Sequence, residues 1–430
     1  MKDTIAVLIH YTDRYALDRA LNSLKQFSAR IKFVYVFLEN QKIFLAKQYA
    51  GDNQIRFITM NDRDLGNMLN DMVDQFKDAN FLFLQHTDYI SQRSDTDLFH
   101  FPQGKKIIGT WQKSQQIRLS QPVLVQSAFL KEQPFIPQYR LPFKEAFFPA
   151  WLCKVDPAFI SWEKELIKPS RKSHAANIVE KQTFNEKYLQ NKSEIGGPSL
   201  AIMISNYNMA SYLEKAITSC LLQTEQAEQI LIIDDGSSDN SMKRLENWHQ
   251  YKQVTIFSKD NGGKARALNE LLQHVKTDFV LELDADDWLD PDAIEIIKKN
   301  LSNLAADTSV LFGNLRRWKQ LGEGDVLFKG ISQGNSVTNL KQLRAYHFPL
   351  GPRIYRTSLL KKYGGFPVVA YEDGRMYEDV SLLNRLIQKS RFCFRDFTVY
   401  NVREHAASIT RQNQTKWNAF IHSLDMDEIN

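Results

Sequence analysis

The sequence predicts an α/β protein made of two doubly wound domains, and three observations support this. First, apolar runs that read as buried strands alternate with segments of helical spacing in both halves of the chain. Second, the order of these elements repeats. Third, the chain has 430 residues, 43% of them hydrophobic and 24% charged, which exceeds one ordinary domain and supplies apolar material for two cores.

The first half shows a β-α-β-α-β order. Residues 5–9 (IAVLI) are expected to form a strand, and apolar residues recur at helical spacing over 15–27. A second strand is expected at 33–38, a helix at 65–76 and a third strand at 81–84. This order is typical of a doubly wound parallel sheet.

The second half repeats that order, with strands expected at 200–204, 230–233 and 279–283 and helices at 212–222 and 264–275. Short motifs repeat as well: Leu268-Asn269-Glu270 follows Leu69-Asn70-Asp71 at an offset of 199 (268 − 69). We interpret this as a tandem duplication of one domain. Two unrelated α/β halves remain the alternative, because βαβ patterns resemble one another on physical grounds alone.

The predicted domains are residues 1–171 and 198–410, joined by a polar linker at 172–197 and followed by a tail at 411–430. Residues 102–171 are rich in aromatic side chains and are assigned to the first domain. Such side chains can line a sugar-binding platform, but packing in the core is their commoner role and is preferred here.

A cluster of acids ends the third strand of the second half. The stretch 279–290 reads FVLELDADDWLD, so Asp284, Asp286 and Asp287 begin where the apolar run stops. Ligands of open α/β sheets bind beyond the carboxyl ends of the strands, and carboxylates suit Mg²⁺ or Mn²⁺ carrying a diphosphate. The alternative is a solvated acidic turn.

The first half lacks these acids. At the offset of 199, Gln85 and Thr87 stand where the second half has Asp284 and Asp286. Amide and hydroxyl groups are poor substitutes for carboxylates at a hard cation. We therefore expect the first domain to be a non-catalytic scaffold or acceptor-binding domain.

The second half contains two further motifs, both before the strand expected at 279–283. Asp234 and Asp235 end a strand and begin the sequence DDGSSD, where carboxylates can bond to a base or a ribose. The motif NGGKARALN follows at 261–269, and its glycines allow close approach of a phosphate to a helix N-terminus that carries Lys264 and Arg266.

In order and spacing, these motifs over 198–292 resemble the donor half of a family 2 glycosyltransferase with the GT-A fold. The resemblance implies tandem Rossmann-like GT-A domains, of which 1–90 is a degenerate copy. It also implies transfer of a hexosyl or N-acetylhexosaminyl group, with inversion, from a nucleotide sugar, usually a UDP-sugar. The implied cofactor is a divalent metal, Mn²⁺ or Mg²⁺. The implied acceptor is a glycan, or a lipid-linked or protein-linked glycan.

The same resemblance implies residue roles. Asp379, in Tyr377-Glu378-Asp379, would be the general base, with Glu378 beside it, although both acids could instead serve only as the first turn of a helix at 380–387. Asp286 and His405 would hold the metal. Arg353, Arg375 and Ser408 would contact acceptor or phosphate. The implied donor-binding residues are Ser205, Tyr207, Asp234, Asp235, Asn261, Gly263, Lys264, Arg266, Asp284 and Ala285.

Composition limits the remaining possibilities. No apolar run is long enough for a membrane span, so we expect a cytoplasmic protein, with contact at the inner face of the membrane left open. A net charge of +5 without basic blocks gives no sign of nucleic-acid binding. Homo-oligomers and glycosyltransferase partners are left open. The alternative functions are a glycan-binding protein without catalysis and, less favoured, a nucleotidyltransferase.

Overall fold

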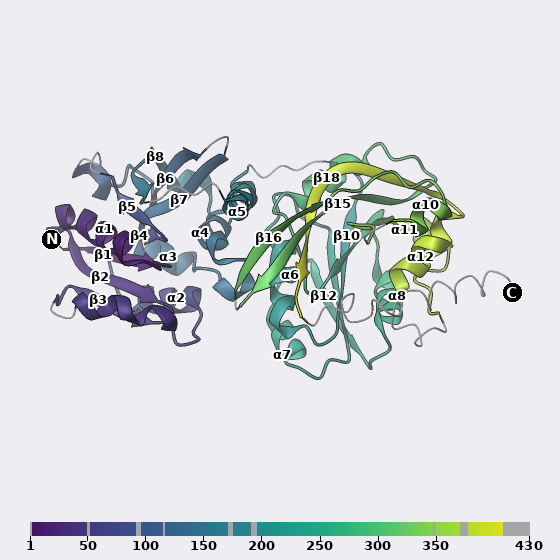
Figure 1. Cartoon of the computed structure of the whole chain (residues 1–430), viewed down its shortest axis with the longest axis horizontal. Coiled ribbons are helices and arrows are strands. Elements are labelled where there is room, and N and C mark those ends of the chain that lie inside the picture. The colour runs from purple at the N-terminus through teal and green to yellow at the C-terminus, as the bar shows by residue number, and fades with distance from the viewer. Residues whose placement is uncertain are drawn as a thin grey trace. The chain divides into compact units, whose positions relative to one another are not determined.

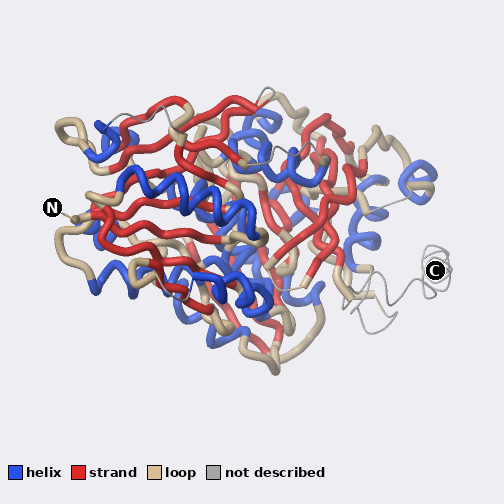
Figure 2. Tube along the Cα trace, turned by 60° about the vertical axis from the view of Figure 1, so that its left-hand side comes forward, coloured by secondary structure: helices blue, strands red, loops and turns tan. Residues whose placement is uncertain are grey.

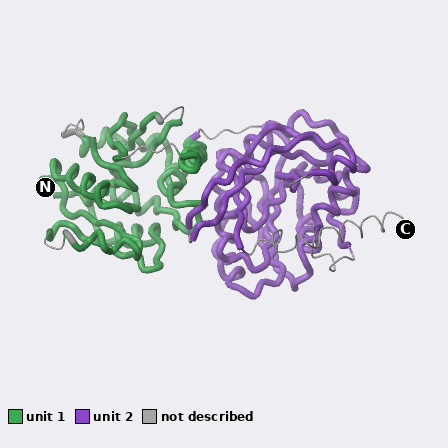
Figure 3. The backbone as a smooth tube through the Cα atoms, viewed as in Figure 1, with its two compact units in different colours: residues 1–189 green, residues 190–430 purple. Residues whose placement is uncertain are grey.

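A computed structural model describes residues 2–49, 52–91, 96–114, 117–170, 175–190, 196–322, 324–346, 349–369 and 377–406. The chain forms two compact units, Met1–Leu189 (unit 1) and Gln190–Asn430 (unit 2) (Figure 3). In each unit helices cover a central sheet (Figure 2). The predicted α/β class is therefore confirmed.

The sheet of unit 1 has, within the described residues, seven strands in the order β3-β2-β1-β4-β7-β6-β8 (Figure 1). The first four are parallel, and β7 runs antiparallel to β4. Two further short strands, β5 and β9, pair with each other. The bounds are β1 Thr4–Ile9, β2 Ile31–Leu38, β3 Ile55–Thr59, β4 Asn80–Gln85, β5 Asp88–Ile90, β6 Ile107–Ser114, β7 Ile117–Gln126, β8 Ile160–Lys164 and β9 Ile167–Pro169.

Helices α1 and α2 of unit 1 begin at acidic caps. The Asp13 carboxylate accepts a hydrogen bond from Ala16 N at 2.9 Å, and the Asp64 carboxylate accepts one from Asn67 N at 3.0 Å. The helices are α1 Arg14–Leu24, α2 Leu65–Gln75, α3 Ser127–Glu132, α4 Phe147–Leu152 and α5 Ala176–Lys187, with 3₁₀ turns at Lys25–Phe27, Asn40–Tyr49, Thr96–Phe99, Gln138–Arg140, Lys144–Ala146 and Pro157–Phe159.

Helix α5 lies in the range expected to be a linker, yet it belongs to unit 1. The buried ammonium of Lys181 pairs with Glu145 at 3.0 Å, and the Phe184 ring packs against Phe143. Unit 1 therefore extends beyond residue 171, because the apolar and charged groups of α5 find their partners there.

Four aromatic side chains of 135–151 are packed in the core of unit 1. Phe135, Phe147, Phe148 and Trp151 are each at most 3% exposed, and their rings contact one another. For these four residues the preferred role, packing in the core, is thus confirmed. Trp111 is half-buried, and the Arg118 guanidinium lies 4.9 Å from the centre of its ring.

Unit 2 is built on a nine-stranded sheet, counted over the described residues. Its order is β12-β11-β10-β13-β17-β15-β18-β14. Strand β16 pairs with β15, and the two lie side by side in Figure 1. Strands β10 to β13 are parallel, whereas β17 runs antiparallel to β13. The bounds are β10 Leu200–Asn206, β11 Gln229–Asp235, β12 Val254–Lys259, β13 Phe279–Asp284, β14 Trp288–Leu289, β15 Thr308–Leu321, β16 Asp325–Ser332, β17 Ile354–Arg356 and β18 Arg391–Glu404.

Both faces of this sheet are buried at its central strands, so those strands show little apolar–polar alternation. Along β10, Ile202 and Ile204 belong to one hydrophobic cluster, whereas Ala201 and Met203 belong to another. The helices are α6 Ala210–Leu221, α7 Ser241–Leu245, α8 Lys264–His274, α9 Ala293–Leu301, α10 Leu340–Arg344, α11 Thr357–Lys362 and α12 Glu378–Ile387, with a 3₁₀ turn at Glu246–Trp248.

The first four strands of each unit stand in the same order: third, second, first, fourth. In both units an antiparallel strand follows next to the fourth. Duplication of one ancestral domain stays a prediction, because this order is common among doubly wound sheets. The order matters for function, since it places the carboxyl ends of the first and fourth strands side by side.

Candidate functional site

The carboxyl ends of β10, β11 and β13 form one edge of the unit 2 sheet. Their register sets Asn206 opposite Asp234 and Ser205 opposite Asp284. Three of the predicted site residues therefore lie on neighbouring strands, and the acidic ends of β11 and β13 flank β10.

Asp234 is 2% exposed and braces the loop after β10. Its Oδ1 accepts hydrogen bonds from Asn206 Nδ2 at 2.7 Å and from Ser237 Oγ at 2.6 Å. Ser237 Oγ in turn accepts one from Asn208 N at 2.9 Å. The first acid of DDGSSD thus positions the Ser-Asn-Tyr-Asn segment.

Asp235 holds the glycine-rich turn before α8. Its carboxylate accepts hydrogen bonds from Gly262 N at 2.9 Å and Gly263 N at 2.7 Å, and Lys259 Nζ lies 3.0 Å away. Gly263 has φ +90°, a conformation that would be strained in a residue with a side chain. The backbone before the N-terminus of α8 is therefore fixed in position by the carboxylate of Asp235, the last residue of β11.

Lys264, the first residue of α8, is surrounded by acids. Its Nζ lies 2.6 Å from Oδ1 of Asp284 and 3.0 Å from Oε1 of Glu282. Oε1 of Glu378 is 3.2 Å away. Burial alone would lower the pKa of Lys264, but these carboxylates raise that pKa well above its usual value. Lys264 is therefore a permanent cation in the centre of the predicted site.

Arg353 makes a second set of ion pairs. Its Nε and Nη2 donate to the Glu282 carboxylate at 3.0 and 3.1 Å, and its Nη1 lies 3.1 Å from Oδ2 of Asp379. Burial tends to raise the pKa of Glu282, but Arg353 and Lys264 outweigh it and lower that pKa. Ionised Glu282, whose side chain is 1% exposed, thus joins the lysine and the arginine.

The acids after β13 have different surroundings. His405 Nε2 lies 2.9 Å from Oδ2 of Asp286. Arg403 donates from Nε to the Asp286 carbonyl at 2.8 Å and from its backbone N to Asp287 Oδ1 at 2.7 Å. Burial, reinforced by Asp286 and Asp284, raises the pKa of Asp287 well above its usual value. Asp287 is accordingly a buried acid that helps to hold the backbone at Arg403 in place.

The other predicted residues vary in accessibility. Tyr207 is 50% exposed, whereas Ala285 is 4% exposed. Arg266 Nη1 donates to the Gly262 carbonyl at 2.8 Å. Arg375 and Ser408 lie outside the described residues.

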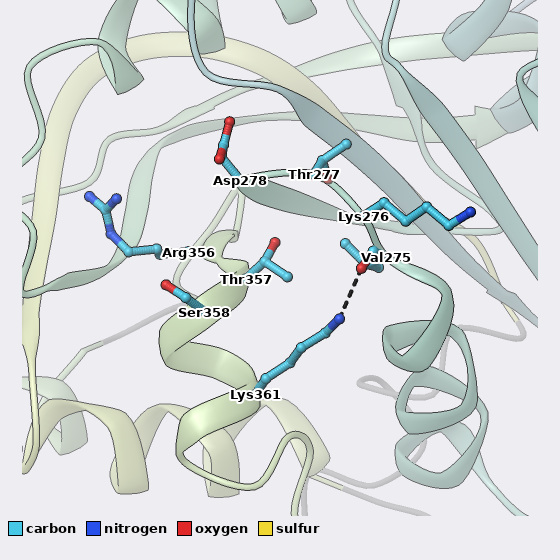
Figure 4. A pocket seen from close by; sticks show the side chains of 8 residues that line it. All are labelled: Val275, Lys276, Thr277, Asp278, Arg356, Thr357, Ser358 and Lys361. Atoms are coloured by element: carbon cyan, nitrogen blue, oxygen red, sulfur yellow. Dashed lines mark hydrogen bonds between the residues drawn. The ribbon is translucent and has the colours of Figure 1, made fainter.

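A cavity of about 280 Å³ lies elsewhere, at the amino end of β13 (Figure 4). Lys361 reaches across it and donates to the Val275 carbonyl at 2.9 Å. None of its lining residues belongs to the predicted site, so the cavity and the acidic edge are separate features. The lining residues are Val275, Lys276, Thr277, Asp278, Arg356, Thr357, Ser358 and Lys361.

Comparison with known proteins agrees with the motifs. Residues 201–364 match the family "Glycosyl transferase family 2". A Haemophilus influenzae protein described as an uncharacterized glycosyltransferase is 36% identical over 184 residues, covering 42% of this chain and 71% of that protein. The chain belongs to glycosyl transferase family 2. The resemblance stated from the motifs is therefore confirmed.

Two further matches of this glycosyltransferase are partial. The chondroitin synthase of Pasteurella multocida is 37% identical over 103 residues, 24% of this chain and 11% of that protein, so the chain spans about a tenth of that relative. The crystal structure of Staphylococcus aureus TarS 1–349 in complex with UDP is 20% identical, with a TM-score of 0.39, covering 48% of this chain and 60% of that one. The structural likeness is too weak to carry an argument.

Several residues of the glycosyltransferase site could not be found from its motifs. Glu282 is one charged residue inside an apolar run, and Arg403 stands just before the predicted His405. Both are at most 2% exposed. A charged residue in an apolar run is the signal that could have marked Glu282, whereas Arg403 lies in no such run. Tyr400, whose hydroxyl accepts a hydrogen bond from Asp284 N at 3.0 Å, carries no such signal.

Two negative findings apply to the described part of the chain. Within it, no group of three or more His, Cys, Asp or Glu side chains is arranged to hold a metal ion. None of its helices combines the length and the apolar character that crossing a bilayer requires.

Proposed function

We propose that unit 2 transfers a sugar, with inversion, from a nucleotide sugar to a hydroxyl group of a glycan acceptor. The observation that carries the proposal is the charge network at one sheet edge. In this network Arg353 pairs both with Glu282, which lies on β13, and with Asp379. This network brings a base candidate to the edge where the family motifs meet. UDP is the proposed nucleotide, and the match to a chondroitin synthase supports a polysaccharide acceptor.

The donor would bind across β10, β11 and β13. Asp235 holds the amides of Gly262 and Gly263 in place, and the turn they form leads into the positive end of α8. Tyr207, half exposed, offers a flat ring for a base. Together these features favour a nucleotide with its phosphates near Lys264.

The residues present fit a divalent cation carried by a diphosphate. Asp286 and His405, 2.9 Å apart, supply one carboxylate and one imidazole. Two protein ligands are sufficient when phosphate oxygens and water complete the shell, as is usual for Mg²⁺ sites. When bound, the metal would neutralise charge on the departing diphosphate. Asp284 is tied to Lys264 at 2.6 Å and would approach the same ion or the ribose.

Asp379 is proposed as the general base. Its carboxylate takes the proton of the acceptor hydroxyl while that oxygen forms a bond to the anomeric carbon and the bond to the diphosphate breaks. Arg353 fixes the direction in which the carboxylate points. The side chain of Asp379 is 24% exposed, which leaves it open to an acceptor.

The proposal is tested by thermal unfolding of the full chain with UDP and a series of UDP-sugars, each with Mn²⁺ and with a chelator. A ligand that binds only the folded state adds about 2.7 kcal/mol of stability at a hundredfold excess over its dissociation constant. Stabilisation by one UDP-sugar and Mn²⁺, followed by release of UDP on adding acceptor, supports the proposal. Stabilisation by glycans but by no nucleotide would favour a glycan-binding protein instead.

A further inference from the structure

Two histidines mark the carboxyl edge of the unit 1 sheet. His10 directly follows β1 and His86 directly follows β4, and these strands are parallel neighbours. The rings are stacked with their centres 5.0 Å apart. Both residues have a positive φ, +62° and +59°, a conformation that costs energy outside glycine and clusters at binding sites.

Buried polar atoms without a hydrogen-bond partner gather at this edge. They are Nδ1 of His10, Nε2 of His86 and Oε1 of Gln85. Ser170 Oγ also lacks a partner, and its backbone N donates to the carbonyl of Thr87, next to His86. At least nine in ten buried polar groups have a partner, so this concentration indicates something still to be bound.

The charge of this edge excludes some ligands. Burial lowers the pKa of His10 and of His86 to about 3, so both rings are neutral. The nearby cations are already paired, Lys181 with Glu145 at 3.0 Å and Lys144 with Glu39 at 3.6 Å. A phosphate would therefore find no cation in need of a partner, and the described residues offer no three-ligand metal group.

The hydrogen-bonding chemistry favours hydroxyl groups. His10 Nε2 lies 3.2 Å from Gln138 Oε1 and, in a neutral ring, donates to it, which leaves Nδ1 as an acceptor. Gln85 Oε1 is an acceptor as well. A hydroxyl can donate to such atoms and can also accept. Gln85, His86 and Thr87 are half-buried, so the edge borders solvent, but the unpartnered atoms themselves are closed to it, and a ligand reaches them only when neighbouring side chains move.

We propose that the carboxyl edge of unit 1 binds an uncharged sugar residue whose hydroxyls donate to His10 Nδ1 and Gln85 Oε1 and bond to His86 Nε2. We assign this sugar to the acceptor glycan, a point that rests on the proposed function. The binding site itself does not depend on that function. Unit 1 then recognises the chain that unit 2 extends.

The test uses ¹⁵N-histidine-labelled full-length protein and nuclear magnetic resonance of the imidazole nitrogens. His10→Asn and His86→Asn assign the two signals, since asparagine tolerates a positive φ. The probes are chitotetraose and maltotetraose, with inorganic phosphate and UDP as charged controls. We expect one neutral tetrasaccharide, and neither control, to shift both signals saturably at millimolar concentration. If neither tetrasaccharide changes the signals, only water forms hydrogen bonds with these atoms, and the proposal is wrong.

A second pair of variants separates binding from folding. Gln85→Leu removes one acceptor and should weaken tetrasaccharide binding about tenfold, the value of one good hydrogen bond. Gln26→Leu changes an exposed glutamine of the same unit and should bind as the wild type does. Equal affinity of both variants would overturn the role of Gln85. UDP binding by unit 2, measured in parallel, shows separately whether the proposed function holds.

Discussion

Nη1 of Arg353 lies 3.1 Å from Oδ2 of Asp379, and the same guanidinium is paired with buried Glu282 on β13. The arginine thus connects the strand that carries the donor-side acids to the start of helix α12. A base candidate and the donor motifs share one rigid support. The predictions for unit 2 follow from this arrangement.

Asp379→Asn keeps the shape of the side chain but removes its ability to take a proton. Transfer should fall by about 10²–10⁴-fold, because that is the usual contribution of a positioned general base. UDP affinity should stay close to that of the wild type. Steady-state kinetics measures the transfer rate, and calorimetry measures the UDP affinity. The matched control is Asp307→Asn, because Asp307 is an exposed acid paired with Arg391. Normal turnover by Asp379→Asn would remove this residue as the base.

Asp286→Ala should abolish the dependence of UDP binding on Mn²⁺, because one of the two proposed protein ligands is lost. Isothermal calorimetry with UDP, with and without Mn²⁺, measures this directly. Asp307→Ala serves again as the control, since its carboxylate lies at the surface. If Asp286→Ala binds UDP and Mn²⁺ as tightly as the wild type, the metal role of Asp286 is wrong.

Arg353→Met should destabilise unit 2 by about 3–5 kcal/mol, because removing one partner leaves Glu282 buried without its main counter-charge. The comparison is Arg391→Met, which breaks the exposed pair with Asp307 and should cost less than about 1 kcal/mol. Urea unfolding followed by tryptophan fluorescence measures both. Equal effects of the two substitutions would show that the buried network contributes little to stability.

Replacing Gln85 and Thr87 together with alanine should leave UDP-sugar affinity unchanged, because unit 1 lacks carboxylates at the positions that correspond to Asp284 and Asp286. Calorimetry on the double variant is the measurement. A loss of UDP binding would show that unit 1 takes part in holding the donor.

Acid should destabilise unit 1. In the folded state burial lowers the pKa of His10 and His86 from 6.5 to about 3, and burial raises the pKa of Asp88 from 3.8 to about 7. Below pH 6.5 each of the two histidines therefore binds a proton in the unfolded chain but not in the folded one. Asp88 opposes this, since the folded chain binds its proton from about pH 7 downward. Two groups outweigh one, so stability falls as the pH drops from 6.5 toward 3.

Variants check the sign of each contribution. The loss of stability between about pH 7 and pH 5 should be smaller in His10→Asn and larger in Asp88→Asn. Urea midpoints at the two pH values measure both changes. A shallower slope in Asp88→Asn would contradict the raised pKa of that carboxyl group.

Much of the fold was predictable because local signals agree with the tertiary structure. The helix expected at 65–76 is α2 Leu65–Gln75, since Asp64 caps its start. The strand expected at 279–283 is β13 Phe279–Asp284, since the apolar run ends at an acid. By contrast, β3 and β12 were not predicted, because these short strands at the sheet margin alternate polar and apolar residues weakly.

The site was only partly predictable. The motifs indicated Lys264 and Asp284, but their direct ion pair depends on how α8 packs against the sheet. Glu282 could not be predicted as a site residue, because a single glutamate in an apolar run does not reveal which residue it pairs with. Its partner Arg353 lies 71 positions away (353 − 282), just before β17, a strand that runs in the opposite direction. Contacts of this kind are set by topology, which motif spacing does not encode.

The ion-pair network of unit 2 draws on residues from Lys264 to Asp379, 115 positions apart (379 − 264). Contacts between such distant segments form only after the intervening chain has been closed into place, which makes them late events in folding. A nascent chain that has not yet released α12 from the ribosome has all the donor motifs but an incomplete charge network. The proposed transfer activity would then appear only once synthesis of unit 2 is nearly finished.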